Sequence, residues 1–202
     1  MADPPEVNAA IDIINLALLK LGLKSLDNID EDNLRARTAR GTYASIRNDV
    51  LRSHPWNFAL VRKVASSSTL PTGSWDFDWA FNKPSGVLAV HAVEGQSAQC
   101  GDEWTIEGDL ILTNLNSGTT DGPYLNTICI DRVTNVTKYD ASFIDALAER
   151  LQAEWAEPLR QVTTLAEAKM LTSETKRKSA YSNDGKEATP RAIQSSTFIN
   201  AR

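Results

Sequence analysis

The chain has 202 residues and a formal net charge of −5, with 42% hydrophobic and 23% charged residues. A chain of this length and composition is long enough to bury a core as one domain. It contains no apolar run near the roughly 20 residues that a membrane span needs. Its start, MADPPEVNAA, lacks the basic and apolar regions of a secretory signal. We therefore expect a protein that is made and used in a cytosol and has no membrane partner.

The first predicted element is a helix over residues 7–22. Asp3, Pro4 and Glu6 form a capping pattern at its start. Apolar residues then recur every three or four positions, which places them on one face of a helix. Gly22 is a plausible stop signal, because glycine tolerates the left-handed conformation that often ends helices.

A second helix is predicted over residues 32–53, with Asp30 or Asp32 as its cap. It ends at His54, because the residue before a proline, here Pro55, is pushed out of the helical region. Arginines are spread over its outer faces, at positions 35, 37, 40, 47 and 52.

Between about 75 and 131 the apolar spacing changes from about 3.6 to 2, which predicts a small antiparallel sheet. GVLAVHAVEG and YLNTICIDRV are predicted strands, and EWTIEGDLILT is predicted to form a hairpin that turns at Glu107-Gly108-Asp109. WDFDWAF fits either a strand or a loop anchor. The preceding ASSSTLPTGS is predicted to be a polar loop, so three or four strands are expected.

Helical spacing returns in two further segments, 141–157 and 164–181. Asp140 is the expected cap of the first, and Pro158 is expected to break or kink it. Residues beyond 181 show no periodicity and few large apolar groups, which is typical of an extended or disordered tail.

These elements predict an α+β fold that is mainly α. A four-helix bundle is expected from residues 1–60 and 135–181, a small antiparallel β insertion from 61–134, and an extended tail from 182–202. Residues 169–202 contain seven lysines and arginines against three acidic residues, so this end has a net charge of +4. The rest of the chain has a net charge of −9, which gives the total of −5. A basic end on an acidic body favours docking on an acidic partner.

Sequence motifs for catalysis are absent. The chain has no GxxxxGK[ST], GxGxxG or GxSxG pattern, so phosphate-binding loops and a nucleophile elbow lack their signatures. Pairs of acidic residues occur at Asp76 and Asp78 and at Glu154 and Glu157. Paired carboxylates can serve acid–base chemistry or bind a cation, but on the surface of a protein they are more often solvated. We expect no enzyme activity.

Cysteines and histidines are too few for a convincing zinc site, since only Cys100, Cys129, His54 and His91 are present. We interpret the cysteines as reduced and structural, and expect no cofactor. His54 follows a helix, where a partly charged imidazole favours the helix dipole. His91 lies within a predicted strand and is interpreted as a packed side chain.

The arginine-rich region from Arg35 to Arg62 has two possible uses. Its guanidinium groups could neutralise nucleic-acid phosphates, or they could bridge carboxylates of a neighbouring subunit. The chain is acidic overall, no recognition-helix signature is present, and acidic residues are interspersed. We favour a subunit interface, with Arg40 and Arg47 as its exposed candidates.

The segment SHPWNFALVRK places large apolar side chains directly after an arginine-rich helix. Pro55 stops the helix, and Trp56 and Phe58 can then each bury about 150–250 Å². We predict that these three residues form a structural anchor where the helices meet the β insertion.

Taken in order, several segments resemble a known family. They are INLALLKLG, ARTARGTYASIRNDVLRSHPWNFALVRK, VEG followed by WTIEGDLILTN, and FIDALAERLQAEWAEPL. They resemble the tail tubular protein A or head-to-tail adaptor family of short-tailed bacteriophages, over about residues 9–180. PWNFA is the most recognisable motif. The other motifs are short, and the resemblance rests on their order and spacing.

The resemblance implies a non-enzymatic virion protein of the tail or neck, made in the host cytoplasm. Family members form a ring, usually of twelve subunits, below the portal protein. They extend the channel for genomic DNA without sequence-specific binding, and they provide the platform for the next tail or nozzle protein. Subunits in such a ring contact one another head to tail.

The family also implies a role for the C-terminal tail, because its extensions commonly reach the portal. The tail residues that would bind there are Lys186, Arg191, Ile193, Phe198, Ile199 and Arg202. Two alternatives stay open: a nucleic-acid-binding virion or regulatory module using Arg35–Arg62, and an enzyme of cell-wall hydrolysis. For the enzyme, the sequence identifies no pair of carboxylates in a cleft.

Overall fold

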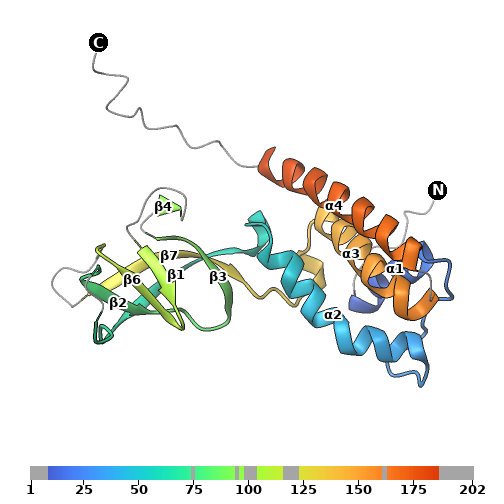
Figure 1. The fold of residues 1–202 in the computed structure, drawn as a ribbon, viewed down its shortest axis with the longest axis horizontal. Coiled ribbons are helices and arrows are strands. Elements are labelled where there is room, and N and C mark those ends of the chain that lie inside the picture. The colour runs from blue at the N-terminus through green and yellow to red at the C-terminus, as the bar shows by residue number, and fades with distance from the viewer. Residues whose placement is uncertain are drawn as a thin grey trace, which may run out of the picture.

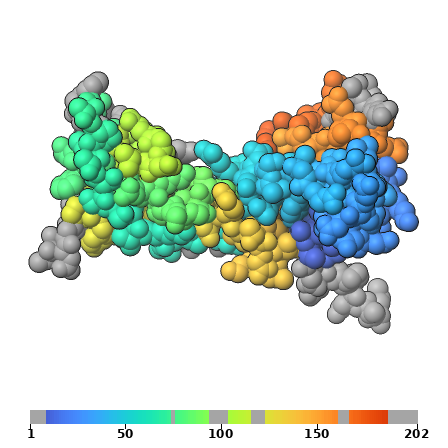
Figure 2. All heavy atoms as spheres, turned by 90° about the horizontal axis from the view of Figure 1, so that it is seen from below, coloured from blue at the N-terminus to red at the C-terminus, as the bar shows by residue number. Residues whose placement is uncertain are grey.

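The computed structural model describes residues 9–73, 76–93, 96–97, 104–115, 123–160 and 163–186. The helices and the sheet form two adjoining parts, and α2 (Leu34–Arg52) leads from one to the other (Figure 1). In the space-filling view the molecule is elongated, with the sheet at one end and the helices at the other (Figure 2).

The central helix of the helical part is α3 (Ala141–Arg160), which packs against α1 (Ala10–Lys20), α2 and α4 (Thr163–Lys186). Its apolar stripe is Phe143, Leu147, Leu151 and Trp155, all buried and spaced by four residues. That spacing places one continuous apolar face along the helix, toward its three neighbours.

The helix starts differ in part from those predicted. Asn33, rather than Asp30 or Asp32, caps α2, because its side chain accepts the Ala36 N–H at 2.9 Å. The first helix begins at Ala10 and not at residue 7, since Ala9 is extended and its N–H is bonded to the Asp12 carboxylate at 3.0 Å. The proposed cap at Asp3 lies outside the described residues.

Asp140 has the predicted capping position, because its carboxylate accepts the Ser142 N–H at 2.7 Å. The helix that follows is not broken at Pro158 and continues to Arg160. Proline in this last turn removes only one backbone donor close to the helix end.

Within the described residues the sheet has seven strands, all antiparallel, in the order β4-β3-β7-β1-β2-β6-β5, and it is nearly closed and barrel-like. The hairpin predicted at Glu107-Gly108-Asp109 is confirmed, and Gly108 has a φ of +60°, which favours glycine. The strands are β1 (Leu60–Ser68), β2 (Trp79–Asn82), β3 (Val87–Val93), β4 (Gln96–Ser97), β5 (Trp104–Glu107), β6 (Leu110–Thr113) and β7 (Tyr124–Asp131).

The prediction of a mainly helical bundle with a small β insertion is wrong. The described residues are 50% helical and 24% strand, and the sheet is a second part of the fold with its own core. That core contains Phe81, Val93, Ile111 and Leu125, all fully buried.

The sheet is larger than predicted partly because a segment predicted to be a loop is a strand, and one helix is longer than predicted. β1 begins at Leu60 and runs through Ala65 and the three serines 66–68, which were predicted to belong to a polar loop. The predicted tail from 182 is also wrong in its first turn, because α4 continues to Lys186.

Candidate functional site: an aromatic junction between helices and sheet

The chain passes from helix to sheet through a short segment after α2. Ser53 is the C-terminal cap of α2, and a 3-10 turn over Asn57–Ala59 leads directly into β1. Pro55 lies between them, where the proline ring cannot continue the helix. The segment fixes how the last turn of α2 and the first residue of β1 are placed.

Trp56 fills the centre of this junction. Its side chain is fully buried, and its indole N–H donates to the Val50 carbonyl at 3.1 Å. Its ring meets Phe143 edge to face with centroids 5.1 Å apart, and Tyr181 at 5.5 Å. Edge-to-face contacts between aromatic rings add to the free energy gained by burial.

Phe58 extends the aromatic group toward α3. It is half-buried, with ring centroids 5.1 Å from Phe143 and 5.7 Å from Tyr139. Tyr139 in turn donates its hydroxyl to the Val133 carbonyl at 2.8 Å. Pro55, Trp56 and Phe58 therefore lie where α2, α3, α4 and the start of the sheet converge.

The last turns of α4 close this junction through Asp184. Its carboxylate is buried and accepts the Asn57 backbone N–H at 3.1 Å, while His54 Nε2 lies 2.9 Å from the other oxygen. An ionised carboxylate only accepts, so Nε2 is the donor. The Asp184 carbonyl also accepts the Asn57 side-chain amide at 2.8 Å.

Tyr181, one turn earlier on α4, completes the attachment. Its ring stacks on His54, with centroids 4.3 Å apart and planes 7° apart, and its hydroxyl lies 2.7 Å from that of Ser53. We call the residues Ser53, His54, Asn57, Tyr181 and Asp184 the α4 clasp. No sequence signal identified it, because its two halves are separated by more than 120 residues.

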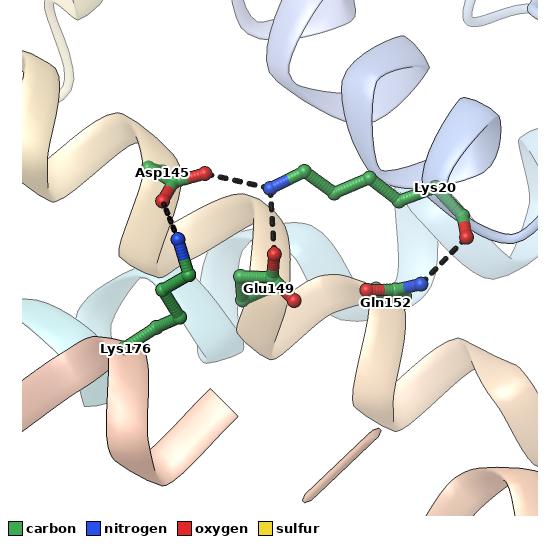
Figure 3. A network of polar contacts seen from close by, with 5 residues as sticks. All are labelled: Lys20, Asp145, Glu149, Gln152 and Lys176. Carbon is green, nitrogen blue, oxygen red and sulfur yellow. Dashed lines mark hydrogen bonds and ion pairs between the residues drawn. The ribbon is translucent and has the colours of Figure 1, made fainter. Parts of the chain in front are cut away.

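A second polar network joins α1, α3 and α4 within the helical part (Figure 3). The Lys20 ammonium lies 2.6 Å from Asp145 and 2.8 Å from Glu149, and Lys176 reaches Asp145 at 3.5 Å. Gln152 donates to the Lys20 carbonyl at 2.6 Å, which satisfies a backbone group at the helix end.

The pairing shifts the pKa values of two of these groups. Burial disfavours the charged ammonium of Lys20, but its hydrogen bonds to Asp145 and Glu149 outweigh burial and raise its pKa above 10.5. Burial also opposes ionisation of Asp145, yet the bond to Lys20 lowers its pKa below 3.8. Both groups are therefore charged at neutral pH.

The two arginines proposed for a subunit interface have different surroundings. Arg40 is exposed and lies 3.7 Å from Asp30 of the same chain. Arg47 is only 9% exposed, and its guanidinium donates to the Asn48 side chain at 2.9 Å. The assumption that both are exposed is wrong for Arg47, which packs within its own protomer over the ring of Tyr43.

Other arginines of the Arg35–Arg62 region also contact their own chain. Arg35 donates to the Lys24 carbonyl, and Arg37 lies 3.6 Å from Asp32. Exposed pairs at these distances are weak. They nevertheless reduce the positive charge that this helix presents to a polyanion.

Most of the proposed portal-binding residues lie outside the residues that the structure describes. Lys186 is in the last turn of α4 and donates to the Asn183 side chain at 3.3 Å. The remaining five lie outside the described residues: Arg191, Ile193, Phe198, Ile199 and Arg202.

The acidic pairs named from the sequence are not brought into a common site. Glu154 binds Arg150 at 2.7 Å and lines a hollow of about 350 Å³ between α2 and α3, while Asp76, Asp78 and Glu157 are exposed. In the described part of the chain, no three His, Cys, Asp or Glu side chains are grouped so as to hold a metal ion.

Comparison with known proteins leaves the family open: no protein-family model matches the chain, and no curated protein matches it. Within the described residues, none of the helices combines the length and the apolar character that crossing a bilayer requires. The functional inference therefore rests on the residues themselves.

Proposed function

We propose that the protein is a head-to-tail connector of a short-tailed bacteriophage. In this proposal it forms a ring, of about twelve copies by resemblance to the family, below the portal. The ring extends the DNA channel and carries the next tail or nozzle protein. The protein is proposed to have no enzyme activity and to reside in the neck of the virion.

The observation that carries the proposal is the order of family-like segments along residues 9–180, centred on PWNFA. The geometry of that central piece supports it. Trp56 lies where three helices and the first strand meet, and the α4 clasp fixes the same point from the other side. A fixed junction keeps the helical and sheet surfaces of a protomer in one orientation, which suits head-to-tail contacts that repeat around a closed ring.

The shape and charge of the protomer also support this function. An elongated protomer with a helical end and a sheet end offers two different surfaces, as head-to-tail contacts require (Figure 2). The net charge of −5 disfavours retention of DNA. A channel component benefits from that property, because DNA must pass without being trapped.

The test is assembly with the portal protein encoded in the same genome. The purified protein would be mixed with portal rings and imaged by electron microscopy, with light scattering to give the mass. We expect a closed ring stacked on the portal around a continuous channel. A monomer that leaves the portal rings bare at micromolar concentrations would overturn the proposal.

A further inference from the structure

The strand β1 is paired along its full length on one side only. Residues Leu60–Ser66 pair with β7, from Leu60 opposite Ile130 to Ser66 opposite Tyr124. On the other side, β2 pairs with β1 only at Ser67 and Ser68. Among the described residues, no strand covers the remaining edge. At its two ends the Leu60 N–H donates to the Trp56 carbonyl at 3.1 Å and the Asn82 amide reaches the Ser66 carbonyl at 3.5 Å, so the open backbone groups are those between Val61 and Ala65 that point away from β7.

A hollow of about 610 Å³ lies along this edge, and we call it the β1 groove. One wall is β1 itself, and the other is the end of β2 with the turn that leads to β3. The hollow is lined by Lys63, Val64, Ser66, Asn82, Lys83, Pro84 and Ser85. The edge is thus bordered by space in which another chain can lie.

Two side chains describe this edge: one shows its exposure to solvent, and the other donates a hydrogen bond to one of its carbonyl groups. Val64, in the middle of the strand, is 62% exposed, so solvent reaches this part of the strand. Asn82 donates its amide to the Ser67 carbonyl at 3.2 Å, at the point where β2 leaves β1. The same amide lies 3.5 Å from the Ser66 carbonyl and 3.2 Å from the Ser66 hydroxyl, so the open stretch of the edge ends before Ser66.

The charges of the β1 groove select its occupant. The Lys63 ammonium donates to the Ser85 carbonyl at 3.1 Å and lies 3.3 Å from Asp131. Lys83 forms no ion pair within the described part of the chain. Arg62 is exposed on the same strand. A segment with carboxylates gains from this surplus of positive charge, and a basic segment is repelled.

We propose that the β1 groove binds an extended acidic segment of another polypeptide, which adds to the sheet as a strand beside Leu60–Ser66. Backbone hydrogen bonds to the open edge supply the affinity, and Lys83 with Lys63 selects glutamate or aspartate at alternate positions. A β-branched residue of the bound segment, between two of these carboxylates, packs over Val64. The inference goes beyond the connector function and holds whether or not the ring forms.

The same charges exclude the simplest competitor, which is a second copy of this edge. Two β1 edges in antiparallel contact would bring Arg62 and Lys63 of each chain close together. Lysine on an edge strand is a common means of preventing such pairing. The arrangement therefore favours a foreign acidic strand over self-association.

The probe is a fluorescein-labelled nine-residue peptide in which glutamate alternates with threonine and valine. Fluorescence anisotropy measures its binding to the full chain, and hydrogen exchange measures protection of the β1 amides. We expect saturable binding, protection confined to alternate amides of Leu60–Ser66, and no binding of the peptide with lysine in place of glutamate.

Two comparisons separate strand addition from adhesion by charge. N-methylation of one set of alternate peptide residues should abolish binding, while methylation of the other set should not, because only one peptide edge faces β1. Lys83→Glu should weaken binding by about tenfold, and Lys138→Glu, a matched exposed lysine away from the groove, should not. No binding at about 1 mM peptide, or equal binding of both methylated peptides, would overturn the proposal.

Discussion

The carboxylate of Asp184 and the imidazole of His54 lie 2.9 Å apart, although 130 residues separate them along the chain. This contact attaches the end of α4 to the turn after α2. Because Asp184 also accepts the Asn57 N–H, one buried carboxylate satisfies two donors of the junction. The position from which the chain continues beyond Lys186 is thereby fixed to the start of the sheet.

Replacing Asp184 with alanine should lower the free energy of unfolding by about 1–3 kcal/mol, because the Asn57 N–H and His54 lose a buried acceptor. Urea denaturation followed by circular dichroism measures the loss. Asn183→Ala is the matched control, since its side chain is exposed on the same helix and accepts a hydrogen bond from the exposed Lys186. Equal stability of the two variants would show that the α4 clasp contributes nothing to folding.

Replacing Trp56 with alanine should cost about 3–5 kcal/mol, because a fully buried ring and its contacts with Phe143 and Tyr181 are lost. Trp56→Phe should cost less, since the ring contacts remain while the indole bond to Val50 is lost. Trp79→Ala, at an exposed position of β2, is the control. Thermal melts in which the two alanine variants unfold at the same temperature would contradict this expectation.

The stability of the helical part should depend on pH through Asp145 and Lys20. The folded-state pKa of Asp145 is lowered, so its contribution is present above 3.8 and is lost as the pH falls through the lower, folded value. The pKa of Lys20 is raised, so its contribution is present below 10.5 and is lost as the pH rises through the higher value.

Asp145→Asn tests the acid side of this dependence. The variant should be less stable than the parent at pH 7 by about 0.5–1 kcal/mol, a modest figure because Asp145 is nearly half exposed. The difference should shrink as the pH falls below 3.8 and through the lower, folded pKa of Asp145, because the parent carboxyl then becomes protonated as well. Asp78→Asn replaces an exposed carboxylate and is the control. Its difference in stability from the parent should not shrink in this way at low pH in denaturation curves measured across this range.

The parts of the fold that could be predicted from sequence are those with strong local signals. The four-residue spacing from Phe143 to Trp155 is sufficient to place α3, and Gly108 between two alternating runs is sufficient to place the hairpin. In both cases the neighbouring residues carry the information, so no distant contact is needed.

The parts that could not be predicted depend on distant partners. β1 has charged and serine residues at most positions, and it is a strand because β7 pairs with all of Leu60–Ser66. The α4 clasp likewise requires that Tyr181 and Asp184 meet residues of the segment after α2. For the same reason Arg47 looked like a surface residue, although the tertiary fold buries it.

The two candidate interface arginines should now behave differently when mutated. Arg47→Glu should destabilise the protomer by about 3 kcal/mol, because it places a carboxylate in a buried site beside Asn48. Arg40→Glu should change stability by no more than about 0.5 kcal/mol, since its pair with Asp30 is exposed. Light scattering of Arg40→Glu therefore tests the proposed interface, and normal assembly would remove Arg40 from it.

The last prediction concerns the segment beyond Lys186, which is proposed to bind the portal. A deletion starting at 182 would remove Asp184 and the α4 clasp, so a loss of binding could simply reflect a damaged fold. The informative deletion is 187–202. It should leave the thermal midpoint unchanged, because no contact of the clasp lies beyond Asp184, yet it should weaken binding to portal rings in a pull-down or by biolayer interferometry. The removed segment contains Arg191, Phe198 and Ile199, which fit an acidic surface with an apolar groove. Unchanged affinity of the shortened chain would show that the tail takes no part in docking.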